Sequence, residues 1–269
     1  MTAAVERPRI AVLGLGEAGS VIAEDLARAA DVVGYDPKHS EPTGHYATAD
    51  SEATAARDAD VIMVLTTGAD APDALAGLSA GARDEALVLD ATSSAPGQKR
   101  ELADAAGDRL RYVDAVFMAP VLPTRIGTPV LASGPAAADA AATLNRLGMK
   151  IEAIGPRVGD AAVRKLLRSI VVKGLSALMI EGLQTARGQD QLDWFSEHLS
   201  DTLTELTPAI LIRLLDGTPK HSERRQHEMA AAETMVRESG LDPVMTAATV
   251  RLLAGLNGDA VVPRGSVLQ

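Results

Sequence analysis

The sequence predicts a doubly wound parallel α/β sheet in its first half and an all-α domain in its second half. Short apolar runs alternate with amphipathic helical stretches from residue 9 to residue 154. A glycine-rich turn joins the first apolar run to the first helical stretch. After Gly155 and Pro156 the strand signal stops and only helical periodicity follows. These observations predict one domain at residues 1–156, a second at 157–258 and a tail at 259–269.

The glycine-rich turn lies in residues 9–36, which contain a strand, the turn, a helix and a second strand. Gly14, Gly16 and Gly19 have the spacing G-x-G-x-x-G. Gly14 permits a tight turn, Gly16 lets the backbone approach phosphates, and Gly19 lets the helix pack closely on the strand. A helix N-terminus also attracts a pyrophosphate. This arrangement predicts a Rossmann-type dinucleotide site, and a glycine turn without a ligand is the alternative.

Asp36 ends the second strand, about 20 residues beyond the turn, where a carboxylate accepts hydrogen bonds from ribose hydroxyls. Its charge disfavours a 2′-phosphate, so we expect NAD as the cofactor, with NADP as the alternative. Lys38 is close enough in sequence to weaken this preference. The expected cofactor-binding residues come from the turn, from Asp36 and from two later strand ends: Gly14, Leu15, Gly16, Glu17, Ala18, Gly19, Asp36, Leu65, Thr66, Thr67 and Ser93.

The remaining elements follow the same alternation. Strands are expected at residues 60–66, 86–90, 111–116, 129–132 and 150–154, and helices at 71–78, 98–106 and 136–147. The second half is expected to hold helices at 160–188, 194–215, 222–238 and 244–256. Two prolines and a glycine make residues 37–46 an expected loop. Ligands of such sheets bind at the carboxyl ends of the strands.

Composition excludes several classes of partner. The 269-residue chain has a net charge of −10 and 2% aromatic residues, which disfavours nucleic acid. It has no cysteine, so disulfides and thiolate metal sites are excluded and a cytoplasmic location is expected. Residues 1–8 lack the pattern of a signal peptide, and no apolar run approaches the roughly 20 residues of a membrane span. No histidine pair has metal-ligand spacing, so no metal is expected.

The tail contains the sequence VPRGS, which is similar to part of an engineered thrombin site. It lacks the leading leucine of that site, so a native origin stays open.

A polar loop follows the strand at residues 86–90. It holds Thr92, Ser93 and Ser94, and in a doubly wound sheet it lies at the cofactor crevice. Hydroxyl groups there can bind a substrate carboxylate or the nicotinamide amide, which makes Ser93 a candidate substrate and cofactor ligand. The alternative is that Ser94 caps the helix that begins near Pro96.

A second candidate segment, residues 114–134, is rich in proline and glycine and follows another strand. A loop at that edge of the sheet would close over a bound substrate, with Met118 as the expected contact. The alternative is a packed connection without ligand contact.

The long helix at 160–188 carries cations among apolar residues. Lys165, Ser169 and Lys173 share one face at about 3.6 residues per turn. A lysine in an apolar crevice can have a depressed pKa and transfer protons near neutral pH. The alternative is that the cationic side chains extend along a domain boundary into solvent.

The chain resembles the β-hydroxyacid dehydrogenases, the family of 3-hydroxyisobutyrate dehydrogenase and 6-phosphogluconate dehydrogenase, across nearly its whole length. GLGEAGS matches the cofactor turn of the family, and DATSS matches its polar loop. Asp114, Gly127 and Thr128 keep the register of the family's substrate loop. Lys165 falls on the family's catalytic lysine. The resemblance implies the fold, a nicotinamide cofactor, a catalytic Lys165 and helices that interlock across a two-fold axis, hence a homodimer.

The chain departs from the family where the substrate binds. Met118, Ala119 and Pro120 replace an S-G-G sequence that holds a substrate carboxylate. Arg168 and Ser169 replace an amide-bearing pair, and Lys173 replaces a tyrosine of the phosphogluconate enzyme. The chain is therefore expected to form a divergent branch with its own helical C-terminal domain.

These features predict a nicotinamide-dependent oxidoreductase that passes a hydride to or from a small, anionic hydroxy or oxo substrate. Lys165 is the expected proton donor and acceptor. The expected substrate contacts are Ser93, Met118, Arg168, Ser169 and Lys173, with Arg168 as a fixed charge. An imine reductase and a dinucleotide-binding protein without turnover are the two alternatives.

Overall fold

The computed structural model describes residues 7–38 and 45–256. The backbone contacts divide the chain into two compact units, Met1–Arg168 and Ser169–Gln269. The division falls within one long helix, and the domain boundary after residue 156 stays a prediction. The VPRGS tail and part of the loop expected at 37–46 lie outside the described residues.

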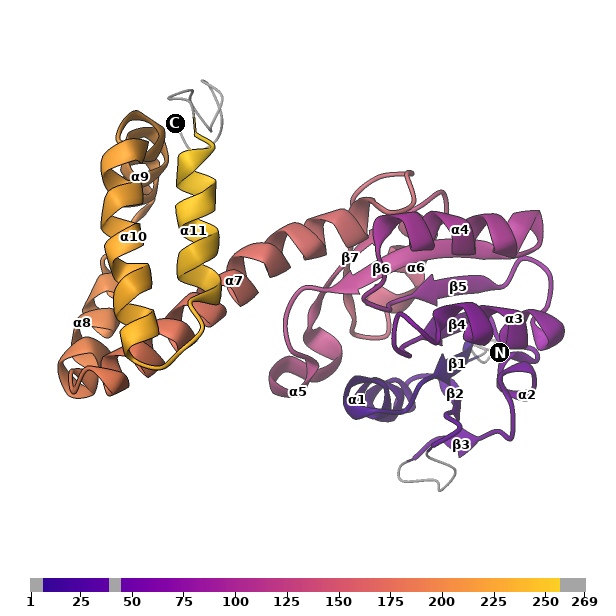
Figure 1. Cartoon of the computed structure of the whole chain (residues 1–269). Helices are drawn as coiled ribbons and strands as arrows, with labels where there is room; N and C mark the ends of the chain where they lie inside the picture. The colour runs from indigo at the N-terminus through magenta and orange to yellow at the C-terminus, as the bar shows by residue number, and fades with distance from the viewer. Residues whose placement is uncertain (1–6, 39–44, 257–269) are drawn as a thin grey trace. The chain divides into compact units, whose positions relative to one another are not determined.

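The first unit contains an eight-stranded sheet with the strand order β3-β2-β1-β4-β5-β6-β7-β8 (Figure 1). Its strands are β1 (Arg9–Leu13), β2 (Asp31–Tyr35), β3 (Ala47–Thr48), β4 (Val61–Val64), β5 (Leu87–Asp90), β6 (Arg111–Phe117), β7 (Pro129–Ser133) and β8 (Lys150–Ala153). The change of direction from β1 toward β2 on one side and β4 on the other is the topological switch of a doubly wound sheet. The predicted fold class is thus confirmed.

One strand pair departs from the fully parallel sheet that the sequence predicted. β6 and β7 pair antiparallel, while the other neighbours are parallel. Their connection holds only the short helix α5 (Val121–Thr124) and the 3-10 turn η2 (Arg125–Gly127). A parallel crossover needs a dozen or more residues, usually in a full helix, so this shorter connection returns the chain in the opposite direction.

Helices cover both faces of the sheet. Successive side chains of each central strand point to opposite sides, so each face has apolar side chains that a layer of helices buries. In β1, Ile10 and Val12 join one buried core while Ala11 and Leu13 join the other. The first core is shared with α1 (Glu17–Leu26) and α6 (Ala137–Asn145). The second is shared with α2 (Glu52–Ala56), α3 (Ala71–Gly81) and α4 (Pro96–Ala106), which the 3-10 turn η1 (Gly107–Arg109) follows.

The sequence prediction missed the short strand β3 and the short helices α2 and α5. Ser51 precedes α2, and its hydroxyl accepts a hydrogen bond from the backbone N–H of Thr54. The helix is five residues long, so it shows little of the periodicity that reveals a longer helix.

The second unit is helical. The long helix α7 (Asp160–Gly188) enters it and is followed by α8 (Leu192–Thr204), α9 (Pro208–Lys220), α10 (Ser222–Glu238) and α11 (Val244–Ala254). The single helix predicted at 194–215 is wrong. It is interrupted before Pro208, where the Thr207 hydroxyl accepts a hydrogen bond from the N–H of Ile210 and caps α9.

A carboxylate of α7 fixes the start of α11 within this unit. Glu181 accepts hydrogen bonds of 2.8 Å from the backbone N–H groups of Met245 and Thr246. Burial raises the pKa of Glu181, but these bonds and that from the Thr246 hydroxyl outweigh burial and keep the pKa below its ordinary value. The charged carboxylate therefore caps α11.

Candidate active site and cofactor pocket

The glycine turn has the geometry that its spacing predicts. Gly14 has a φ of +92°, and a Cβ atom there would lie 2.7 Å from the backbone carbon of Leu65. A Cβ atom on Gly19 would lie 1.8 Å from the carbonyl oxygen of Gly14, so only glycine lets α1 pack against the turn. A Cβ atom on Gly16 would meet no atom within 4 Å. The space above Gly16, at the N-terminus of α1, is therefore open to a ligand.

Asp36 is joined to this turn. Its carboxylate accepts hydrogen bonds of 2.8 Å from the backbone N–H groups of Leu15 and Lys38. A carboxylate has about four lone-pair positions, so these two hydrogen bonds do not by themselves prevent Asp36 from accepting from ribose hydroxyls. The structure thus gives Asp36 a second function, holding the turn, that sequence spacing does not reveal.

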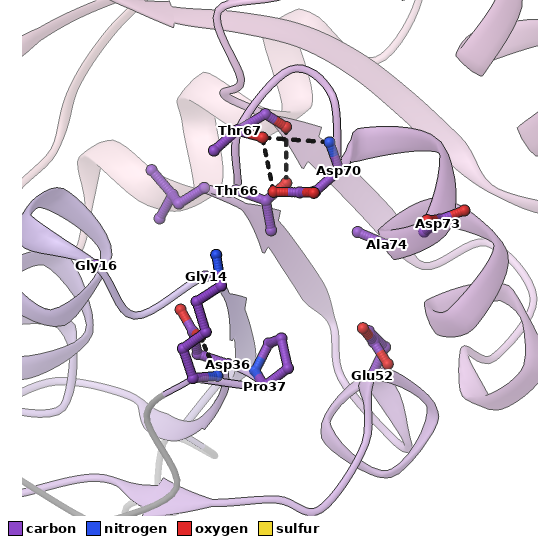
Figure 2. A pocket seen from close by; sticks show the side chains of 12 residues that line it. Gly14, Gly16, Asp36, Pro37, Glu52, Thr66, Thr67, Asp70, Asp73 and Ala74 are labelled. Carbon is purple, nitrogen blue, oxygen red and sulfur yellow. Dashed lines mark hydrogen bonds between the residues drawn. The ribbon is translucent and has the colours of Figure 1, made fainter.

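A pocket of about 430 Å³ opens beside the turn. Figure 2 shows Asp36, Pro37 and Glu52 around one end of it and Thr66, Thr67 and Asp70 at the other. The predicted residues Gly14, Gly16, Asp36, Leu65, Thr66 and Thr67 line it, together with Pro37, Lys38, Glu52, Asp70, Asp73 and Ala74. The sequence prediction missed the carboxylates of Glu52, Asp70 and Asp73, because no local pattern brings α2 and α3 to this pocket.

The polar loop after β5 presents one hydroxyl outward. Thr92 and Ser94 are buried and their hydroxyl oxygens lie 2.8 Å apart, whereas Ser93 between them is exposed. The backbone N–H and hydroxyl of Thr92 donate to Asp90, which fixes the loop. Ser94 does not cap α4, whose N-cap residue is Ala95 without a side-chain cap, so that alternative is wrong.

Behind this loop lies a buried charge cluster that the sequence prediction missed. The Lys99 ammonium, fully buried, lies 3.0 Å from a carboxylate oxygen of Asp90 and 3.5 Å from one of Asp114. Asp90 and Asp114 are paired residues on the parallel strands β5 and β6. The Tyr112 hydroxyl donates to Asp90, and burial followed by the nearby Asp90 charge raises the pKa of Tyr112, which keeps it a neutral donor. We call Asp90, Lys99 and Asp114 together the Asp90–Lys99–Asp114 cluster.

Asp114 also holds the first turn of α7. One of its oxygens accepts hydrogen bonds of 3.1 Å from the backbone N–H groups of Gly159 and Ala162, and from the Ser133 hydroxyl. The Ser133 oxygen accepts in turn from the N–H of Ala161. Unpaired N–H groups at a helix start need such acceptors.

The predicted residues of α7 follow this anchored turn along one helix. Lys165 is half-buried and Arg168 is exposed, and both belong to the first unit. Ser169 is half-buried and Lys173 exposed, and both belong to the second unit. Lys165 thus shares a compact unit with the glycine turn and the Ser93 loop.

The segment that contains Met118 is anchored. The N–H of Met118, which is half-buried, donates to the carbonyl of Pro129 at 2.8 Å. Arg125 forms a two-pronged ion pair with Asp25 of α1, at 3.0 and 2.8 Å. These contacts match the alternative of a packed connection, and the role of Met118 in substrate binding stays a prediction.

Two classes of feature are absent from the described part of the chain. In residues 7–38 and 45–256 no group of three or more His, Asp or Glu side chains could hold a metal ion. None of the helices within those ranges is long and apolar enough to cross a membrane.

Comparison with known protein families gives a match in each half of the chain. Residues 9–155 match the NAD binding domain of 6-phosphogluconate dehydrogenase. Residues 186–256 match a domain of unknown function, DUF1932. The first match covers the β-sheet unit with its glycine turn and gives it NAD(P) as its cofactor.

Solved structures of similar chains span the whole length. A conserved hypothetical protein from Sinorhizobium meliloti 1021 is 29% identical, with 98% of this chain and 93% of that chain covered and a TM-score of 0.60. A conserved protein of unknown function, described as structurally similar to 3-hydroxyacid dehydrogenases, is 27% identical over 92% of this chain and 96% of its own, with a TM-score of 0.60. A reductive aminase from Aspergillus terreus in complex with NADPH4, cyclohexanone and allyl amine shares the fold, at 20% identity over 93% and 95% of the chains and a TM-score of 0.75.

A curated relative matches over a shorter range. An uncharacterized 28.5 kDa protein from Methanothermus fervidus is 31% identical over 106 residues, which are 39% of this chain and 42% of that protein. The chain thus matches less than half the length of this relative. Because this family match extends over residues 9–155, more than half of the chain, the protein belongs to the family defined by the NAD binding domain of 6-phosphogluconate dehydrogenase.

Proposed function

We propose that this protein is an NAD(P)-dependent oxidoreductase that transfers a hydride between the nicotinamide and the carbon atom of a small hydroxy or oxo substrate with an anionic group. The observation that carries the proposal is the open space above Gly16, at the start of α1 and beside the pocket that Asp36 lines. A pyrophosphate fits that position, because backbone N–H groups and the helix dipole point into it. The bound cofactor supplies the hydride chemistry.

The chain's own residues position the substrate and move a proton. We assign proton transfer to Lys165, as acid in reduction and as base in oxidation. Ser93 is the exposed hydroxyl of the loop at the end of β5, where a doubly wound sheet receives its ligands. Arg168 carries a permanent positive charge that suits an anionic substrate group. Ser169, Lys173 and Met118 complete the proposed substrate contacts.

We further propose a preference for NAD over NADP. The pocket beside the turn is lined by four carboxylates, those of Asp36, Glu52, Asp70 and Asp73, and by the ammonium of Lys38. The pyrophosphate is common to both cofactors, so its repulsion cancels in the comparison. The additional 2′-phosphate of NADP would be repelled by the excess of negative charge in this lining, which disfavours binding of NADP.

An imine reductase is the second candidate. Met118, Ala119 and Pro120 offer apolar side chains where the β-hydroxyacid dehydrogenases have a sequence that holds a carboxylate. The likeness in fold to a reductive aminase and to an imine reductase from Aspergillus terreus is consistent with this candidate. A dinucleotide-binding protein without turnover is the non-enzymatic alternative.

One experiment separates these three functions. The purified protein is titrated with NADH and then supplied with a panel of 2-oxo and 3-oxo acids or with a panel of cyclic imines, while NADH oxidation is followed. Turnover of oxo acids supports the first proposal, and turnover of imines alone supports the second. Binding of NADH without turnover of either panel contradicts both enzymatic proposals.

We also propose that the protein is a homodimer. Large apolar residues along α7 are exposed in the single chain, including Ile170 at 70% and Val171 at 68%. An exposed apolar surface of this extent is typical of an interface. A second copy of α7 would cover it.

A further inference from the structure

We infer that Lys99 and Asp114 are positioning residues, which hold the Ser93 loop and the start of α7 in one fixed arrangement. The inference rests on the proposed function in one respect, because it assigns the effect of this arrangement to Lys165. Neither residue is expected to contact the substrate or the cofactor.

The contacts divide the Asp90–Lys99–Asp114 cluster into two arms. Asp90 holds the polar loop, since it accepts hydrogen bonds from the backbone and hydroxyl of Thr92 at 2.9 and 2.7 Å. Asp114 holds α7 through the backbone N–H groups of Gly159 and Ala162. The Lys99 ammonium lies between them and also donates to the backbone carbonyl of Asp90 at 2.8 Å. A displacement of either arm would therefore disturb the contacts of Lys99.

The charge balance makes Lys99 necessary to this arrangement. Asp90 and Asp114 are neighbours across β5 and β6, and both are at most 2% exposed. Two buried carboxylates at this spacing repel each other and lack the solvation that water would provide. The oxygen of Asp114 that faces Lys99 has no hydrogen-bond partner among the described residues, so the ammonium at 3.5 Å stabilises its charge.

The same contacts set the position of Lys165. It lies three residues beyond Ala162, less than one turn of helix past the last N–H that Asp114 holds. A shift of the first turn of α7 would thus move the Lys165 side chain relative to the Ser93 loop. Misplacement of a reacting group by about 1 Å can reduce the rate roughly 100-fold.

The test combines variants of Asp114 and Lys99 with Lys165→Met. Asp114→Ala removes the acceptor for α7, Asp114→Asn keeps one oxygen, and Lys99→Met removes the ammonium from a side chain of similar length. Thr207→Ala, which removes the cap of α9, is the matched control for loss of a helix cap. Three quantities are measured for each: the dissociation constant of NADH, the single-turnover rate of NADH oxidation with a substrate from the panels, and amide hydrogen exchange of residues 159–163.

We expect Asp114→Ala and Lys99→Met to lower the single-turnover rate roughly 10-fold to 100-fold and to accelerate exchange at residues 159–163. The affinity for NADH should change less than about twofold in Asp114→Ala, because Asp114 holds α7 whereas Gly14, Gly16 and Gly19 lie on a different loop. Asp114→Asn, which keeps one acceptor oxygen, should have a single-turnover rate closer to that of the unmodified protein than Asp114→Ala has. Thr207→Ala should change neither the rate nor the exchange of these amides.

A double-mutant cycle distinguishes positioning from a general loss of structure. If Asp114 acts through Lys165, Asp114→Ala combined with Lys165→Met will be no slower than Lys165→Met alone. If the rate losses of the two single variants multiply in the double variant, or if Asp114→Ala keeps the unmodified rate, the inference is overturned while the proposed function stays intact. If neither panel of substrates is turned over, the proposed function fails. Unchanged amide exchange at residues 159–163 in both Asp114→Ala and Lys99→Met would overturn the inference independently of turnover.

Discussion

The backbone N–H of Leu15 donates a hydrogen bond of 2.8 Å to the carboxylate of Asp36, so one residue both lines the pocket beside α1 and holds the glycine turn. Removal of Asp36 therefore has two separable effects. One acts on the ribose and on the charge of the pocket, and the other acts on the shape of the turn.

We expect Asp36→Ala to weaken NADH binding about tenfold or more, because a charge-assisted hydrogen bond and the support of Leu15 are both lost. Asp36→Asn keeps an acceptor for Leu15 and removes the charge, so it should bind NADH better than Asp36→Ala and bind NADPH better than the unmodified protein. Fluorescence titration with both cofactors measures this. Equal or tighter binding of NADPH by the unmodified protein would contradict the NAD preference.

The glycine turn gives a paired prediction. Gly16→Ala should fold normally, because its Cβ atom meets no protein atom within 4 Å, but it should weaken NADH binding by about tenfold where the methyl group displaces the pyrophosphate. Gly19→Ala should destabilise the fold by roughly 1–3 kcal/mol or more, since its Cβ atom would overlap the carbonyl of Gly14. Urea unfolding and NADH titration of both variants separate the two effects. A stable Gly19→Ala variant with normal NADH affinity would refute the close-packing account.

Local patterns in the sequence were sufficient to predict most of the helices and strands of the fold. Strand and helix periodicity located β1, β2 and β4–β6, and the bounds of α7 and α10 agree with those predicted. The strand β7 was predicted, but its antiparallel direction was missed, because an apolar run carries no information about its direction. The break between α8 and α9 was missed because Pro208 occupies the first turn of a new helix, where proline is well tolerated.

The candidate site was only partly predictable for a different reason. Gly14, Gly16, Asp36 and Thr66 line one pocket, and sequence could group them because they belong to a contiguous motif or to strand ends; their binding of a cofactor stays a prediction. Lys99 gave no such signal, because a lysine within a polar helix ordinarily faces water. Its burial follows from the pairing of β5 with β6, which brings Asp90 and Asp114 together from distant parts of the chain.

The Asp25–Arg125 pair predicts a specific dependence of stability on pH. Burial raises the pKa of Asp25, but the hydrogen bonds from Arg125 and from the N–H of Ile126 outweigh burial and hold the pKa below its ordinary value of 3.8. A lowered folded-state pKa stabilises the protein fully above the ordinary value, and this contribution is lost as the pH falls through the folded-state value.

The urea midpoint of Asp25→Asn should accordingly lie below that of the unmodified protein by a constant amount from about pH 5 to pH 8. The difference should shrink in more acidic solution. Thr207→Ala, which removes a neutral cap, serves as the control whose effect should not depend on pH in this range. A difference that grows on acidification would show that the pair does not stabilise the charged form of Asp25.

If the exposed apolar surface of α7 forms the dimer interface, one charged residue placed on it should dissociate the dimer. The unmodified protein should have the mass of a dimer in light scattering at micromolar concentration. Ile170→Glu should shift it to a monomer, because a carboxylate at the centre of that surface would lose its hydration on association. Leu122→Glu, at an exposed apolar residue of α5, is the matched control and should remain dimeric. A monomeric unmodified protein would refute the proposal.

The assignment of Lys165 is tested most directly by comparing Lys165→Met with Lys173→Met in single-turnover oxidation of bound NADH. These lysines lie about two turns apart on α7, and each change removes one ammonium. Lys165→Met should lower the rate of hydride transfer roughly 100-fold or more, the usual size of general acid–base catalysis, with NADH affinity nearly unchanged. Lys173→Met should keep a rate closer to that of the unmodified protein. Near-full hydride transfer in Lys165→Met would contradict the account, whether Lys173→Met is inactive or not.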